Sequence, residues 1–185
     1  MKTKRLTLCA FFIVLYILGS KITVPLGVIP LTLQTMMIII AGILLKPSEI
    51  FISYGVYFLM GLVGLPVFAT GGGIAYVLQP SFGFLLSFPF AASFIAYMKE
   101  HYHFHNFLSL YPICLIALLF IYAVGCIYMY GIFNFYMDVQ KDFASIIAIG
   151  ATPFVISDAI SIAIGCFAAI KIGAIKQVSN VLENI

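Results

Sequence analysis

Charged residues are scarce in this sequence. Only 8% of the 185 residues are Asp, Glu, Lys or Arg, whereas 64% are hydrophobic. Because about a quarter of the residues in an average soluble domain are charged, this composition excludes an ordinary soluble protein. We expect an integral membrane protein that forms one domain over residues 1–185.

Other absences exclude several kinds of function. The four cysteines form no CxxC motif, so we interpret them as small packing residues and expect no metal site. No GxxxxGK[ST] motif is present, which excludes ATP hydrolysis through a P-loop. The basic residues lie at the ends of hydrophobic segments and form no patch for nucleic acid. We therefore expect no cofactor and no nucleic-acid partner.

Six hydrophobic segments predict an all-α protein with six transmembrane helices. They cover residues 6–22, 32–45, 49–65, 81–98, 107–130 and 153–172. The second segment is short, so we expect it either to tilt little or to begin inside the membrane.

The apolar stretch 142–172 would be about 45 Å long as one helix, which exceeds a single span. The sequence Gly-Ala-Thr-Pro at 150–153 interrupts it. Since Pro has no backbone donor and restricts the residue before it, we predict a short helix near 142–149. A separate sixth span would then begin with Pro153 in its first turn.

Basic residues predict the orientation of the chain. If the N-terminus is cytoplasmic, seven of them lie inside and two outside. The inside residues are Lys2, Lys4, Arg5, Lys46, Lys99, Lys171 and Lys176, and the outside residues are Lys21 and Lys141. Both termini are therefore predicted to be cytoplasmic, and the segments 29–34, 61–84 and 131–152 are predicted to form an external lid and pocket.

The first of these segments, IPLTLQ at 29–34, contains Thr32 and Gln34. A Gln side chain that faced lipid would be costly, so we expect both residues to face the interior. Contact with a ligand is one interpretation. Hydrogen bonding between helices is nearly as well supported.

The second segment, residues 61–84, is rich in Gly and Pro. Irregular backbone is tolerated at membrane depth only where protein buries it or a cavity accepts it, which favours a binding site. Gly72 and Gly73 would let the backbone approach a ligand closely. Phe68 and Tyr76 would close over an apolar ring, although Tyr76 fits an interfacial aromatic belt equally well.

Asp158 is the only carboxylate placed inside a predicted span, about one and a half turns below the external start of its helix. Ionisable residues inside a membrane are costly and indicate function. The helix N-terminus favours the ionised form. We therefore predict that Asp158 binds a ligand, the alternative being a carboxylate that faces water or caps nearby backbone.

The two irregular segments resemble the BioY family, the biotin-binding membrane subunit of energy-coupling factor (ECF) vitamin importers. The matching residues are Pro30, Leu31, Thr32, Gln34, Gly61, Gly64, Pro66, Phe68, Gly72, Gly73, Pro80 and Gly83. The resemblance implies a subunit in the bacterial cell membrane that captures biotin externally. It also implies a membrane coupling protein and two cytoplasmic ATPases as partners.

The resemblance further implies roles for individual residues. In the family a DxxK pattern follows Pro-Phe; here Pro153, Phe154 and Asp158 match, but Ser161 stands at the Lys position. An ionised Asp158 would accept hydrogen bonds from the cyclic urea of biotin. Gln79 could donate to a carboxylate or accept from the urea. The departures at Ser161 and Gln79 keep lipoate and dethiobiotin open as alternative ligands.

An intramembrane enzyme is the alternative from another functional class. It would need a nucleophile and a base at matching depth. The three histidines, His101, His103 and His105, are predicted in a cytoplasmic loop, whereas Asp158 is predicted near the external side. We therefore expect solvated loop histidines, no catalytic residues and no enzyme.

Overall fold

The computed structural model describes residues 3–26, 29–102 and 106–182, with side chains to residue 171 except that of Leu26. The elements in chain order are α1 (Thr3–Lys21), β1 (Thr23–Leu26), β2 (Ile29–Thr32), α2 (Gln34–Leu44), α3 (Pro47–Leu62), η1 (Ile74–Leu78), α4 (Phe82–Tyr102), α5 (Phe107–Gly131), η2 (Ile132–Tyr136), α6 (Phe143–Gly150) and α7 (Val155–Leu182). Here η1 is a 3₁₀ helix and η2 is a π-helical turn. The prediction of an all-α membrane protein is confirmed in its main feature, because the described chain is mostly helical, and the structure adds one two-stranded hairpin.

Three helices in the described part of the chain are long and apolar enough to cross a membrane: α1, α4, and α5 continued through η2. The pair α6 and α7 gives a fourth candidate that is bent by 46°. The other two predicted spans are shorter helices. Helix α2 has 11 residues, a rise of about 16 Å, and α3 has 16 residues, a rise of about 24 Å.

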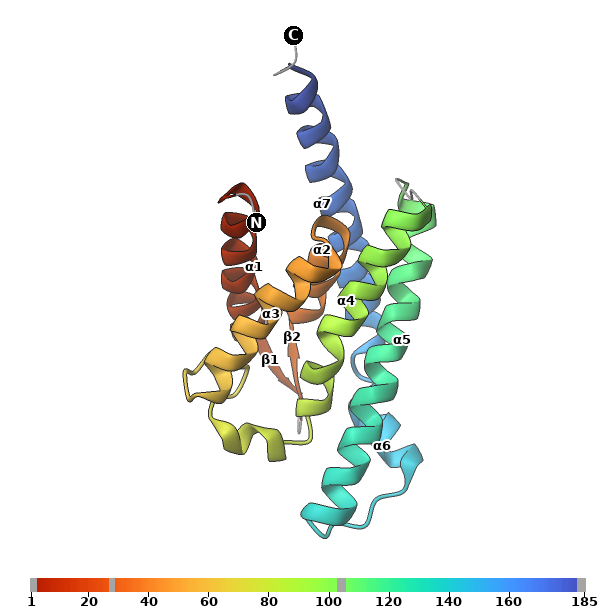
Figure 1. Cartoon of the computed structure of the whole chain (residues 1–185). Coiled ribbons are helices and arrows are strands. Elements are labelled where there is room, and N and C mark those ends of the chain that lie inside the picture. The colour runs from red at the N-terminus through yellow and green to blue at the C-terminus, as the bar shows by residue number, and fades with distance from the viewer. Residues whose placement is uncertain (1–2, 27–28, 103–105, 183–185) are drawn as a thin grey trace.

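The helices form a bundle whose two ends differ (Figure 1). The beginning of α1 and the end of α7 lie toward one end, whereas η1, η2 and α6 lie toward the other. The two strands extend from the end of α1 and the start of α2 toward the same end as η1. The segments predicted to form an external pocket therefore lie at the end opposite to the chain termini.

A small antiparallel hairpin precedes the helix that was predicted to begin at residue 32. Strands β1 and β2 pair in a register that sets Thr23 opposite Thr32 and Pro25 opposite Pro30. Since Pro cannot donate to a ladder, it is tolerated only in an edge strand, and both strands of a two-stranded sheet are edges. Thr32 consequently ends a strand, and Gln34 is the first residue of α2.

The break between α6 and α7 is confirmed, but its details differ from the prediction. Pro153 precedes α7 and lies in the turn 151–154, where the backbone N–H groups of Phe154 and Val155 both donate to the carbonyl of Ala151. Helix α7 therefore begins later, at Val155. Asp158 lies in its first turn and not one and a half turns below the start.

The glycine-rich segment between α3 and α4 is held against the end of α1. Ser20 donates its hydroxyl to the carbonyl of Val67 at 2.6 Å, and the Lys21 ammonium donates to that of Phe68 at 2.6 Å. The Phe68 ring packs on Gly61, where an added Cβ would lie 2.0 Å from the ring. These contacts bury Val67 and Phe68 and anchor the segment to α1, while much of the rest of the segment is exposed.

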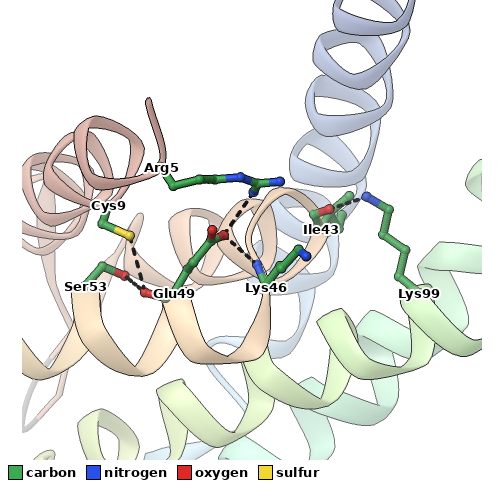
Figure 2. A network of polar contacts seen from close by, with 7 residues as sticks. All are labelled: Arg5, Cys9, Ile43, Lys46, Glu49, Ser53 and Lys99. Atoms are coloured by element: carbon green, nitrogen blue, oxygen red, sulfur yellow. Dashed lines mark hydrogen bonds and ion pairs between the residues drawn. The ribbon is translucent and has the colours of Figure 1, made fainter. Parts of the chain in front are cut away.

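Polar contacts also join the helices at the opposite end (Figure 2). The buried Glu49 carboxylate accepts from the Arg5 guanidinium at 3.1 Å and from the Lys46 backbone N–H at 3.0 Å, linking α1 to α3. The Lys99 ammonium donates to the carbonyl of Ile43 and so links α4 to α2. These basic residues from the predicted cytoplasmic side hold helices together in addition to any role in topology. Lys2 and the side chain of Lys176 lie outside the described residues.

Candidate functional site

A cavity lies where β2, the first turns of α2 and α7, and the glycine-rich segment meet α4 and α5. Its empty space, which includes the open mouth, is about 580 Å³. The polar residues that line it are Thr32, Gln34, Thr35, Tyr76, Ser81, Tyr122 and Asp158. Aromatic rings and aliphatic side chains, including Phe84, Phe88 and Phe154, form the rest of the wall.

Asp158 provides the only charged side chain among the described residues that line this cavity. Its side chain is 6% exposed, and its Oδ2 accepts a hydrogen bond from the Tyr122 hydroxyl at 2.7 Å. The Thr35 side chain also interacts with the carboxylate. A carboxylate has about four acceptor positions, so capacity remains for donors of a ligand. The nearby N-terminus of α7 adds partial positive charge that favours the ionised group.

Three more of the predicted site residues line the cavity. Thr32 accepts the backbone N–H of Gln34 at 3.3 Å on its Oγ1 and so joins the hairpin to α2. Gln34 is buried and donates its Nε2 to the Tyr57 hydroxyl at 2.9 Å, so it connects α2 to α3 as well as facing the cavity. Tyr76 is buried, and its hydroxyl accepts from Thr70 at 3.4 Å.

The other five predicted site residues do not line the cavity. Phe68 lies behind Tyr76, with ring centroids 4.6 Å apart. Gln79 accepts from the Thr70 hydroxyl at 3.3 Å, and the half-buried Ser161 lies one turn further along α7 than Asp158.

Both glycines in this group have a local reason to be glycine. At Gly72 an added Cβ would lie 2.1 Å from the carbonyl oxygen of Leu65, and Gly73 has a φ of +103°. These conformations shape the segment itself. They explain both glycines without requiring a ligand.

Sequence reasoning missed Tyr122, Thr35 and Ser81 as lining residues. Tyr122 lies midway along a nearly continuous apolar helix, and its 36-residue separation from Asp158 gives no sign that the two meet. A phenol inside a predicted span is a weak signal, because the sequence holds 11 tyrosines. Of the three, Thr35 was the easiest to recognise, because it directly follows the predicted site residue Gln34.

Neither predicted external cation lies at the cavity wall. Lys21 binds the Phe68 carbonyl, and the Lys141 ammonium lies 5.5 Å from the centroid of the Phe133 ring. His103 and His105 lie outside the described residues. In the part of the chain that is described, no three His, Cys, Asp or Glu side chains group as metal ligands.

Comparisons with known proteins place the chain in a family. The sequence profile of the BioY family matches residues 1–178. A probable biotin transporter BioY of Lysinibacillus sphaericus is 37% identical over 164 residues, covering 84% of this chain and 80% of the relative. A probable biotin transporter BioY of Pyrococcus horikoshii is 35% identical over 164 residues, covering 88% and 92%.

A solved structure agrees with these sequences. It is the S-component for biotin from an ECF-type ABC transporter, and its fold matches this chain with a TM-score of 0.82 and 28% identity over 94% of this chain and 92% of that one. Sequence and fold agree over nearly the whole length, and the chain belongs to the BioY family.

Proposed function

We propose that this chain is the biotin-binding subunit of an ECF-type importer and that biotin binds in the cavity beside Asp158. The observation that carries this proposal is the buried Asp158 carboxylate in the wall of a largely apolar cavity. The relatives, named as biotin transporters, support the same ligand.

The wall of the cavity suits the two halves of biotin's ring system. The urea carries two N–H donors, which an ionised carboxylate accepts in short, charge-assisted hydrogen bonds. The sulfur-containing ring is apolar and would pack against the side chains of Phe84, Phe88 and Phe154. The valerate tail carries a negative charge, for which the described wall supplies no Lys, Arg or His.

We further infer how the chain is oriented in the membrane and which partners it needs. Both termini would be cytoplasmic, and the cavity would open to the outside of a bacterial cell membrane, as the distribution of basic residues supports. Because the sequence has no P-loop, transport energy would come from two ATPases that act through a membrane coupling protein.

Calorimetric titration of the purified protein with biotin, dethiobiotin and lipoate tests the ligand. Dethiobiotin keeps the urea but lacks the sulfur ring, whereas lipoate has no N–H donor for Asp158. We expect biotin to bind most tightly and lipoate to bind about 100-fold more weakly or not at all, since charge-assisted hydrogen bonds are lost. Tighter binding of lipoate, or no binding of biotin, would refute the assignment.

A further inference from the structure

The Tyr122 hydroxyl donates a hydrogen bond to the Asp158 carboxylate, and the two residues come from different helices. Tyr122 lies on α5 and Asp158 on α7, and their side chains meet at 2.7 Å in the wall of the cavity. A carboxylate without such a partner could rotate about the Cβ–Cγ bond. A donor fixed on α5, together with the Thr35 side chain, instead sets which oxygen faces Tyr122 and which acceptor positions remain for a ligand.

We propose that Tyr122 is a positioning residue, which holds Oδ2 of Asp158 so that the remaining acceptor positions of the carboxylate face the N–H donors of the ligand. This inference rests on the proposed function and adds to it a residue that controls affinity. The ligand then meets a carboxylate that is already oriented, and binding does not have to order it.

The structure offers a matched control on the same pair of helices. Tyr111, 11 residues earlier on α5, donates its hydroxyl to the backbone carbonyl of Ala159 at 3.3 Å. This bond also ties α5 to α7, but it does not involve the carboxylate. Removing this bond shows how the loss of one hydrogen bond between α5 and α7 affects biotin affinity by itself.

The test measures biotin affinity by calorimetry for the parent, Tyr122→Phe and Tyr111→Phe. Each change removes one oxygen and keeps the ring, and size-exclusion chromatography checks that each variant is monodisperse. We expect Tyr122→Phe to raise Kd about tenfold, as loss of a charge-assisted contact would, and Tyr111→Phe to change it by less than about twofold.

The same pair of measurements in an Asp158→Asn background separates positioning from a general structural role. There the Tyr122 hydroxyl would hold the amide oxygen and turn the amide NH₂ toward the ligand's own donors. Removing that hydroxyl lets the amide rotate, so Tyr122→Phe should leave biotin affinity unchanged or improve it. A purely structural role predicts the same loss in both backgrounds.

Three results would overturn the inference: parent-like affinity of Tyr122→Phe, equal losses for Tyr122→Phe and Tyr111→Phe, or equal losses from Tyr122→Phe in both backgrounds. Failure of the parent protein to bind biotin is a different result. It would refute the proposed function, and the inference would fall with it.

Discussion

Replacing Asp158 by Asn tests the site at its polar centre. The change keeps the size of a side chain that is 6% exposed, but it exchanges an ionised acceptor for a neutral amide. Loss of one hydrogen bond to a charged group costs about 1.5–3 kcal/mol, which corresponds to an increase in Kd of about 10- to 150-fold.

The hydrogen bond from Tyr122 places the expected loss near the upper end of that range. Because the Tyr122 hydroxyl donates to Oδ2 at 2.7 Å, the amide of Asn would turn its oxygen toward Tyr122. Its NH₂ group would then face the cavity, where it meets the N–H donors of the urea. We therefore expect affinity for biotin to fall about 100-fold.

The assay is calorimetric titration of biotin, with thermal unfolding measured on the same samples. Asp138→Asn is the control, since Asp138 is exposed in the connection after η2 and has a φ of 54°, a conformation that Asn adopts readily. We expect parent-like affinity for this control. Asp158→Asn should not unfold at a lower temperature, because a neutral amide costs less to bury than a carboxylate. Parent-like binding by a folded, monodisperse Asp158→Asn protein would show that the carboxylate is not the anchor.

Three further predictions concern orientation, transport and the glycine-rich segment. In a cysteine-free background, Tyr102→Cys should react with an impermeant thiol reagent only after the membrane is opened; labelling from outside intact cells would reverse the orientation. Cells that lack the coupling protein and ATPases should not accumulate biotin against a gradient through this chain, and uptake of labelled biotin under those conditions would show independent transport. Gly72→Ala would place Cβ 2.1 Å from the Leu65 carbonyl oxygen, so we expect about 1–3 kcal/mol less stability in thermal unfolding. Gly55→Ala is its matched control, because the added Cβ would meet no described atom within 4 Å beyond its chain neighbours and its own helix backbone. A fall in stability equal to that of Gly72→Ala would argue against the steric explanation.

The helices were predictable because each corresponds to a long apolar segment that is bounded by polar residues or by Gly and Pro. Every predicted span overlaps one of the observed helices, and the predicted outer helix at 142–149 corresponds to α6 at Phe143–Gly150. The hairpin was not predicted because Pro25 and Pro30 argue against strands. They are tolerated only because neither strand has a second neighbour.

The sequence predicted those residues of the candidate site that are costly to place in a membrane. It did not predict those whose place at the cavity depends on how the helices pack. A carboxylate at 158 and an amide at 34 stand out against an apolar background, and both line the cavity. Tyr122 does not stand out, since the pattern of α5 is apolar around the helix and does not indicate which face meets α7. Gly72 and Gly73 were predicted as ligand contacts, whereas the close approach of the Leu65 carbonyl and the positive φ explain these glycines without a ligand.

The hairpin explains why a cavity exists at this depth in a protein made mostly of helices. If residues 29–32 were helical, regular side-chain packing would extend through the region that β2 now borders. Because α2 begins only at Gln34 and α7 only at Val155, the two helices start beside the cavity. Backbone groups at a helix start have no partner within the helix. The Thr32 hydroxyl accepts the backbone N–H of Gln34 at the start of α2, and the Ala151 carbonyl accepts that of Val155 at the start of α7. The irregular segments thus open space for a ligand while keeping their own polar groups bonded, a condition that backbone at membrane depth must satisfy.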